Sequence, residues 1–144
     1  HGVVRLGMRD VPESEVSSVL DGKLLNTGVP HYVQQVDNLD EYDVVANGRR
    51  LRFHEAMGED GANINFVEPM ADGVLKVRTY ERGVEDETWA CGTGVTACAI
   101  ATGVCRLKAV GGDFEVSYCH ADGRYSQVFL QGPVSLNFTG KITI

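Results

Sequence analysis

The chain has 144 residues, of which 43% are hydrophobic and 23% are charged, and its formal net charge is −7. This length and composition are typical of one folded domain, and they exclude a disordered chain and, since no apolar run approaches about 20 residues, a membrane-spanning helix. The negative charge argues against a nucleic-acid ligand, because phosphate binding requires clustered positive side chains.

Short apolar runs indicate β-strands along most of the chain. In residues 74–80 apolar and polar side chains alternate, as in a sheet with one face in water. Asp-Gly pairs in residues 71–73 and 121–123 predict hairpin turns, because this pair favours the positive φ that tight turns require. The seven predicted strands are residues 3–6, 32–36, 64–68, 74–80, 114–118, 128–130 and 135–138.

Two helices are predicted between these strands. The first spans residues 41–55, although Gly48 weakens the prediction because glycine disfavours helix interiors. The second begins near Thr93 and ends at Gly103, and because it has no charged residue and no polar face we expect it to be buried on all sides. The sequence therefore predicts an α+β fold in which the strands wrap around a central buried helix.

The four cysteines, at positions 91, 98, 105 and 119, form no Cys-x-x-Cys pair and no cluster with zinc-ligand spacing. We therefore expect no structural metal. The first residues lack the basic start and long apolar stretch of a signal peptide, so we expect reduced thiols in a cytoplasmic protein. Cys98, Cys105 and Cys119 have no activating neighbour in the sequence, and we interpret them as structural thiols.

Residues 87–94, with the sequence Glu-Thr-Trp-Ala-Cys-Gly-Thr-Gly, directly precede the buried helix and point to chemistry. The first amides of a helix have no internal partner, and the helix dipole adds positive charge there, so this turn can bind a carboxylate. Cys91 at the same point would be stabilised as a thiolate. A base beside a carboxylate site is the arrangement that an amino-acid racemase without a cofactor requires.

Simpler interpretations of these residues stay open at this point. Cys91 fits equally a buried structural cysteine beside a helix end. The neighbouring Glu81 and Arg82 fit a surface ion pair, and His31, which follows a proline, fits a loop histidine with one hydrogen bond.

Three segments, in the same order along the chain, resemble motifs of one family. They are residues 28–33 (Gly-Val-Pro-His-Tyr-Val), residues 61–66 (Gly-Ala-Asn-Ile-Asn-Phe) and residues 80–94, which contain Tyr-Glu-Arg-Gly-Val and Ala-Cys-Gly-Thr-Gly. Together they resemble diaminopimelate epimerase, an isomerase that works without a cofactor. The resemblance implies that residues 1–144 are the C-terminal domain of a two-domain fold and that the N-terminal domain is absent.

The resemblance also implies roles for individual residues. Cys91 matches the cysteine that works on one face of the substrate Cα, and His31 and Glu81 match polar groups that flank the two catalytic thiols. The implied substrate-binding residues are Asn63, Arg82, Gly92 and Thr93. The first two match residues at the far amino-acid end of diaminopimelate, and the last two match donors to the carboxylate at the reacting centre.

Family members invert the Cα with two cysteines, one on each face, and the second lies in a Cys-Gly-Asn turn that this sequence does not contain. The chain also lacks an initiator Met, so we expect a fragment that is inactive alone and needs the N-terminal half of the same enzyme as its partner. The resemblance implies lysine biosynthesis as the pathway and no pyridoxal phosphate, metal or nucleotide, and it allows a homodimer.

Two departures and two rival functions remain. Val29 stands where some members have asparagine, and the loop at residues 83–87 is one residue longer than in many relatives. A proline racemase-like isomerase is one alternative, although the Glu81-Arg82 pair favours a substrate with a second charged end. A non-catalytic anion-binding module is the other, and a Cys91 that ionises more readily than a free cysteine would argue against it.

Overall fold

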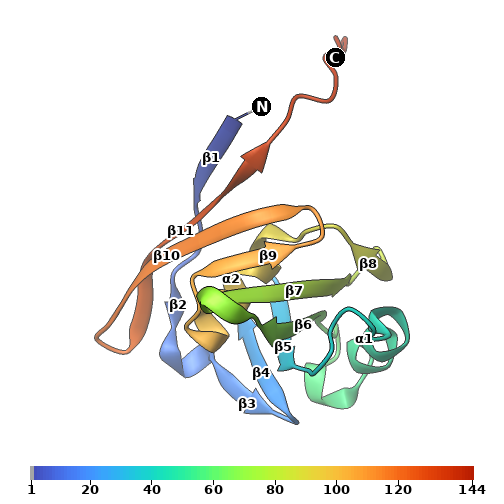
Figure 1. Ribbon diagram of the computed structural model, residues 1–144, viewed down its shortest axis with the longest axis vertical. Helices are drawn as coiled ribbons and strands as arrows, with labels where there is room; N and C mark the ends of the chain where they lie inside the picture. The colour runs from blue at the N-terminus through green and yellow to red at the C-terminus, as the bar shows by residue number, and fades with distance from the viewer. Residues whose placement is uncertain (1) are drawn as a thin grey trace.

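The computed structural model describes residues 2–144 (Figure 1). One sheet of eleven strands is present in this part of the chain. The strands are β1 (Gly2–Gly7), β2 (Val11–Pro12), β3 (Ser17–Val19), β4 (Gly22–Asn26), β5 (Pro30–Gln35), β6 (Asn63–Pro69), β7 (Val74–Glu81), β8 (Asp86–Thr88), β9 (Arg106–Ala109), β10 (Gly112–Ala121) and β11 (Arg124–Val134). The α-helices are α1 (Val44–Arg52) and α2 (Gly92–Thr102), and short 3-10 turns span Glu13–Glu15, Glu55–Met57 and Ala71–Gly73.

The strand order is β1-β11-β10-β9-β7-β6-β5-β4-β3, with β2 paired to β11 and β8 paired to β7. Only β5 with β6 and β7 with β9 run parallel among the described strands. A long sheet of twisted strands curls, and here it curls around α2 (Figure 1). The prediction of an α+β fold with strands wrapped around a central helix is confirmed.

Helix α2 fills the inside of the curled sheet. Its residues 94–101 are all buried, and it contacts β4, β5, β6, β7, β9, β10 and β11. Because the helix has no charged side chain, its burial does not require a charge to be removed from water. The helix ends where Gly103 adopts a left-handed conformation with φ 75°, as glycine does at helix C-termini. Neither helix in residues 2–144 is long and apolar enough to span a membrane.

Helix α1 packs on the other face of the sheet, against β6, β7 and β8, and is shorter than predicted. It begins after Asp43, whose side chain accepts a hydrogen bond from the Ala46 amide at 3.0 Å, rather than at residue 41. Gly48, which weakened the prediction, is buried, and a Cβ atom there would lie 2.4 Å from Tyr80 Cβ. The glycine therefore lets α1 lie directly against β7.

Five of the seven predicted strands lie within strands of the sheet, and a sixth, residues 32–36, extends one residue past the end of β5. Both Asp-Gly turns are confirmed with positive φ at Asp72 and Asp122. The prediction of a strand at residues 135–138 is wrong. Strand β11 ends at Val134, and residues 135–144 pair with no strand in the described part of the chain. An alternating pattern forms a strand only when a neighbouring strand supplies hydrogen bonds.

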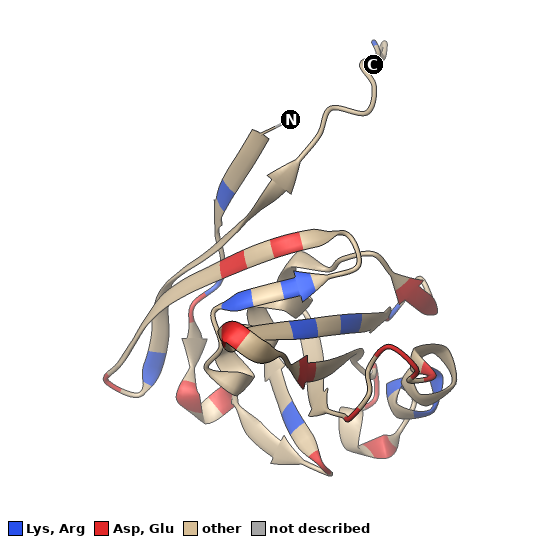
Figure 2. Cartoon of the chain, in the orientation of Figure 1, with Lys and Arg blue, Asp and Glu red and all other residues tan. Residues whose placement is uncertain are grey.

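Burial alternates along β7 as predicted, but its polar face is only partly open to water. Lys76 and Arg78 are half-buried on this face. The Arg78 guanidinium donates to Leu39 O at 2.8 Å and Tyr42 O at 3.0 Å, so the segment before α1 covers the strand. Positive and negative residues are interspersed over the body of the molecule (Figure 2).

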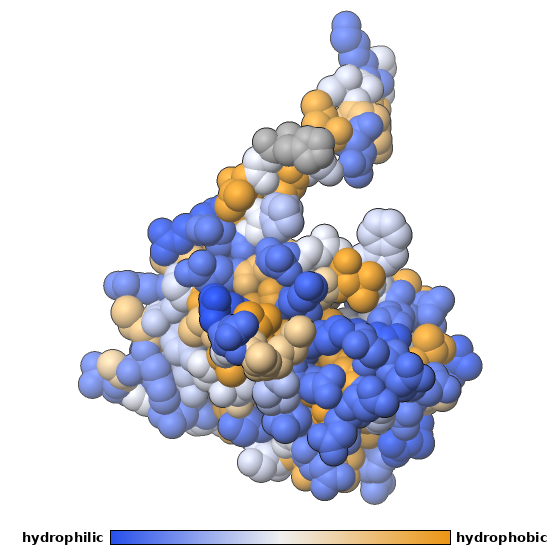
Figure 3. Space-filling model, viewed as in Figure 1, coloured by the Kyte–Doolittle hydropathy of each residue, from blue (hydrophilic) through white to orange (hydrophobic). Residues whose placement is uncertain are grey.

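Strand β1 and the end of β11 project together from the body of the molecule (Figure 1). Strand β11 continues into the C-terminal tail. Every residue of β1 is exposed. Hydrophobic side chains lie along this projection (Figure 3), and the most exposed in the tail are Leu136, Phe138, Ile142 and Ile144. The projection therefore carries apolar surface that the described chain does not cover.

Candidate active site

Three neighbouring strands place polar side chains on the face that α2 covers. In the parallel pairing of β5 and β6, His31 lies opposite Asn63, and in the antiparallel pairing of β6 and β7, Asn65 lies opposite Thr79. Because side chains alternate along a strand, all four point to the same side of the sheet. All four are also buried, so each needs a hydrogen-bond partner inside the protein.

Cys91 is the residue from which α2 begins. The Val95 amide makes the first helical hydrogen bond, to Cys91 O at 2.8 Å, so the amides of Gly92, Thr93 and Gly94 precede any helical partner. The Cys91 thiol is half-buried and makes no capping hydrogen bond to these amides. Cys91 therefore lies at the N-terminus of a helix whose first amides have no helical partner, as the sequence predicted.

A line of hydrogen bonds joins the strands to this helix end. His31 Nδ1 lies 3.0 Å from Asn65 Nδ2, and His31 Nε2 lies 2.8 Å from Thr93 Oγ1. Thr93 Oγ1 in turn lies 3.4 Å from Cys91 Sγ. Burial lowers the pKa of His31 to about 4, and the positive charge of Arg82 adds to this effect. His31 is therefore neutral near pH 7 and is part of the buried site rather than a loop histidine.

Asn63 connects two backbone segments. Its Nδ2 donates to Pro30 O at 3.0 Å, and its Oδ1 accepts from the Arg82 amide at 2.8 Å. The Arg82 guanidinium makes only long contacts to backbone oxygens, at 3.4 Å to Gly61 and 3.5 Å to Asp60. No carboxylate in residues 2–144 forms an ion pair with Arg82. Its charge is available for an external anion.

Glu81 stands at the end of β7 and is half-buried. Its side chain makes no hydrogen bond within the described chain, and none joins it to Cys91, so the structure does not bring these two predicted residues into direct contact. The neighbouring Glu85 does have partners: it accepts from Arg52 Nε at 3.0 Å and from Tyr80 OH at 3.2 Å. Glu81 and Arg82 do not form a surface ion pair with each other.

Sequence reasoning missed three members of this cluster, Thr27, Asn65 and Thr79. The Thr27 hydroxyl donates to Thr93 O at 2.7 Å, and the Thr79 hydroxyl donates to Asn65 Oδ1 at 2.9 Å. Asn65 carried a signal, since it is polar between Ile64 and Phe66 in a buried strand. The threonines carried none, because threonine is common in strands.

The other three cysteines differ from one another. Cys98 is fully buried in α2, and burial raises the pKa of its thiol well above the ordinary value, so the interpretation as a core residue is confirmed. Cys105 is half-buried and Cys119 is exposed. All four thiols are free, and residues 2–144 contain no group of three or more His, Cys, Asp or Glu side chains arranged to hold a metal ion.

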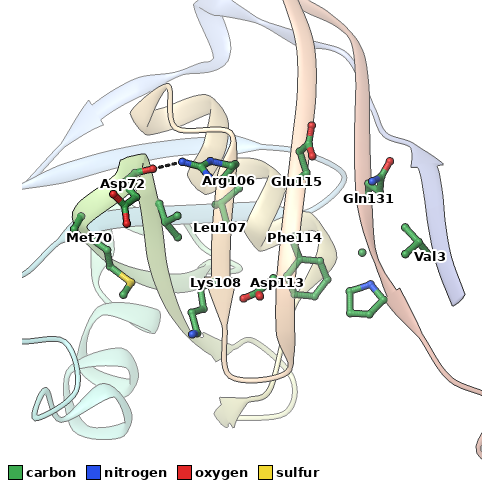
Figure 4. Close-up of a pocket in the computed structure, with 14 residues that line it drawn as sticks. Val3, Met70, Asp72, Arg106, Leu107, Lys108, Asp113, Phe114, Glu115 and Gln131 are labelled. Carbon is green, nitrogen blue, oxygen red and sulfur yellow. Dashed lines mark hydrogen bonds between the residues drawn. The ribbon is translucent and has the colours of Figure 1, made fainter. Parts of the chain in front are cut away.

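A groove with a volume of about 690 Å³ lies elsewhere, across β9, β10, β11 and β1 (Figure 4). Arg106, Lys108, Asp113 and Glu115 line it beside Phe114. Arg106 donates to the Asp72 carbonyl, so part of this charge already has a partner. None of the predicted site residues lines the groove. The cluster around Cys91 is the better candidate site, because it combines a thiol, free amides and a buried histidine.

Comparison with solved structures defines the class of fold. The chain resembles a probable proline racemase from Agrobacterium radiobacter K84, solved with bound carbonate, with a TM-score of 0.65 and 19% sequence identity. The likeness covers 90% of this chain and 50% of that protein. The chain therefore has the same α+β fold as one half of that probable proline racemase.

Sequence comparison then defines the family. The model of the diaminopimelate epimerase family matches residues 23–136. A protein named diaminopimelate epimerase from Aquifex aeolicus is 44% identical over 128 residues, which are 85% of this chain and 46% of that protein. Another from Flavobacterium psychrophilum is 40% identical over 144 residues, with 94% of this chain and 56% of that protein covered. The chain belongs to the diaminopimelate epimerase family, and it spans about half the length of these relatives.

Proposed function

We propose that this chain is the C-terminal domain of a cofactor-independent isomerase that interconverts L,L- and meso-diaminopimelate, and that Cys91 transfers the proton at one face of the substrate Cα. The single observation that carries this proposal is the position of Cys91 at the free amides of α2, beside the Thr93 hydroxyl at 3.4 Å. Family membership supports the choice of reaction.

The geometry suits the most difficult step of such a reaction. When a base removes the Cα proton of an amino acid, negative charge develops on the adjacent carboxylate. Fixed amide donors and a helix dipole stabilise that charge without reorganising. The amides of Gly92, Thr93 and Gly94 have no helical partner and can serve this task, and in this proposal Cys91 faces the Cα next to the bound carboxylate.

Arg82 supports a substrate with two amino-acid ends. Its guanidinium has no carboxylate partner in residues 2–144 and offers a two-pronged donor. The Asn63 amide fixes the Arg82 backbone, and we propose that both residues hold the far carboxylate and amino group of diaminopimelate. Glu81, without an internal hydrogen bond, is then free to accept from an ammonium group or to assist Cys91.

Inversion at the Cα needs an acid on the face opposite the base. We propose that the N-terminal half of the same enzyme supplies it as a second cysteine, since the relatives are about twice as long as this chain. The exposed apolar side chains of β1 and the tail are the surface we assign to that half. Residues 1–144 alone are then inactive, and the complete enzyme is a cytoplasmic protein of lysine biosynthesis that forms a homodimer.

The decisive experiment follows Cα deuterium uptake into meso-diaminopimelate in heavy water by NMR. The chain alone is expected to give no exchange with inversion, and exchange should appear when the remaining half of the Aquifex aeolicus relative is added. Cys91→Ser should abolish the restored exchange, whereas Cys119→Ser, at an exposed thiol on β10, should not. Exchange with inversion by the chain alone would refute the need for a second domain.

A proline racemase-like reaction is the second candidate, because the fold likeness favours it. The same NMR assay with L-proline tests it directly. Exchange with proline but not with diaminopimelate would select this candidate and would leave Arg82 without a role. Binding of either amino acid without any exchange, with both halves present, would instead select an anion-binding module.

A further inference from the structure

The side-chain amide of Asn65 is fixed in one orientation between β5, β6 and β7. Its Nδ2 donates to Tyr32 O at 3.0 Å, and its Oδ1 accepts from the Thr79 hydroxyl at 2.9 Å. A backbone carbonyl can only accept, so the contact with Tyr32 determines which end of the amide faces β5. The second N–H of Nδ2 is therefore the group that lies 3.0 Å from His31 Nδ1.

A donor at this position determines the tautomer of His31. An N–H group facing Nδ1 requires a bare nitrogen there, and a neutral imidazole then carries its proton on Nε2. His31 Nε2 lies 2.8 Å from Thr93 Oγ1, so its N–H donates to the threonine oxygen. The lowered pKa of His31, about 4, agrees with a neutral ring at physiological pH.

The Thr93 hydroxyl has one proton and, once its oxygen accepts from His31, that proton is directed elsewhere. Cys91 Sγ lies 3.4 Å from Thr93 Oγ1, within reach of an O–H donor to sulfur. A donor to a thiolate stabilises the charged form. Donor and acceptor roles therefore run in one direction, from Asn65 through His31 and Thr93 to Cys91.

We propose that Asn65 is a positioning residue that locks His31 as the neutral Nε2–H tautomer and thereby directs the Thr93 hydroxyl at the Cys91 thiolate. The proposal rests on the proposed catalytic role of Cys91. It assigns His31 a role as a hydrogen-bond donor inside the domain, not as the base that removes a proton from substrate. Thr79 contributes to the same positioning, because its hydroxyl donates a hydrogen bond to Asn65 Oδ1.

The first test reads the His31 ring of the 144-residue chain by imidazole ¹⁵N NMR. At pH 7 the wild-type ring should be protonated at Nε2 and bare at Nδ1. Asn65→Asp keeps the shape but replaces the donor with an acceptor, so His31 should acquire a proton at Nδ1 at the same pH. Asn137→Asp makes the same charge change in the exposed tail and should leave the ring unchanged.

Cys98 reports whether each variant is folded, because it is completely buried and alkylates only when the domain opens. If Asn65→Asp unfolds the chain, the test rests on the wild-type spectrum, which shows which nitrogen of the His31 ring carries the proton. A wild-type ring protonated at Nδ1 at pH 7, or a folded Asn65→Asp chain with an unchanged His31 ring, overturns the proposal.

The second test measures the pH profile of iodoacetamide labelling at Cys91, resolved from the other thiols by mass spectrometry. Thr93→Val should move the midpoint of the profile upward by about one pH unit, the loss expected for one hydrogen bond to a charged group. Thr93→Ser, which keeps the hydroxyl, should restore the wild-type profile. His31→Ala should move the midpoint in the same direction.

The double variant of His31→Ala and Thr93→Val separates a serial arrangement from two independent effects. It should match Thr93→Val alone, because His31 acts only through the Thr93 hydroxyl. Independent, summed effects overturn the proposal, as does a Thr93→Val profile identical to the wild type. Both tests read the thiol and the ring directly, so they succeed or fail separately from the epimerase assay.

Discussion

Gly94 and Asn65 approach so closely that a Cβ atom on Gly94 would lie 2.6 Å from Asn65 Oδ1. The same atom would lie 3.2 Å from His31 Cε1 and 3.3 Å from Cys91 Cβ. The absence of a side chain at the second glycine of the Cys-Gly-Thr-Gly turn is therefore what lets α2 contact the polar cluster of β5 and β6. Glycine in such a turn lets the backbone approach another group closely, and here that group belongs to the protein itself.

Gly94→Ala should destabilise the domain by about 1–3 kcal/mol, because the added methyl meets a buried, fixed amide. Gly92→Ala is the matched control, since its Cβ would meet only Leu130 Cδ2, at 3.1 Å, at the flexible end of a side chain. The gain in helix propensity, up to about 1 kcal/mol, is similar for both. Urea unfolding of both variants measures the difference, and equal stabilities would contradict the close approach.

His31 should make the domain less stable in acid. Its pKa is about 4 in the folded chain and 6.5 when unperturbed, so the unfolded chain binds the proton first as pH falls. The contribution of His31 is complete above pH 6.5, decreases through the interval down to pH 4 and is lost below it. At about 1.4 kcal/mol per pH unit, this loss amounts to about 3 kcal/mol.

Urea unfolding at pH 7, 5.5 and 4 tests this dependence by difference. The loss in the wild type should exceed that in His31→Gln, which cannot titrate, by about 3 kcal/mol. Asn137→Gln, in the exposed tail, should retain the full wild-type dependence. Identical pH dependence in the wild type and His31→Gln would mean that His31 is charged or accessible in the folded domain.

Two threonines that face each other across β7 and β8 should respond oppositely to the same substitution. Thr79→Val removes the donor to the buried Asn65 Oδ1 and should cost about 1–3 kcal/mol. The Thr88 hydroxyl is buried and has no hydrogen-bond partner in the described chain, so Thr88→Val should be neutral or stabilising. Unfolding free energies decide, and a cost at Thr88 equal to that at Thr79 would contradict the assigned network.

The central helix and the curled sheet were predictable because their signals are local. Residues 94–101 contain no charged side chain and only one polar residue, Thr96, and a helix without a polar face must be buried. Strand β4, with two polar residues among its five, gave no comparable signal and was missed. Residues 135–138 were predicted as a strand from a short apolar run, but strand pairing is not a local property, and no strand of the described chain pairs with them.

The candidate site divides in the same way. Cys91 and its glycines stand together in the sequence, so their position at the N-terminus of a helix was predictable. The connection of His31 to Thr93 spans 62 positions and depends on the packing of α2 against β5. Asn65 and Thr79 enter the site only through the pairing of β5 with β6 and of β6 with β7, which no single segment reveals.

Arg82 should determine selectivity for a substrate with two charged ends. In the complete two-domain enzyme, Arg82→Lys should raise KM for diaminopimelate about tenfold or more, because a lysine cannot make a two-pronged contact with a carboxylate. Since this contact lies far from the reacting carbon, kcat should change much less. Arg49→Lys, at an exposed position on α1, should leave both constants unchanged.

Cys91 labelling in the Arg82→Lys variant separates binding from damage to the site. An unchanged labelling profile with a raised KM means that Arg82 binds the far end of the substrate. A KM that stays at the wild-type value would show that the far carboxylate binds elsewhere. The preference for a substrate with two amino-acid ends would then need another residue, and the lack of a carboxylate partner for Arg82 in residues 2–144 would not explain it.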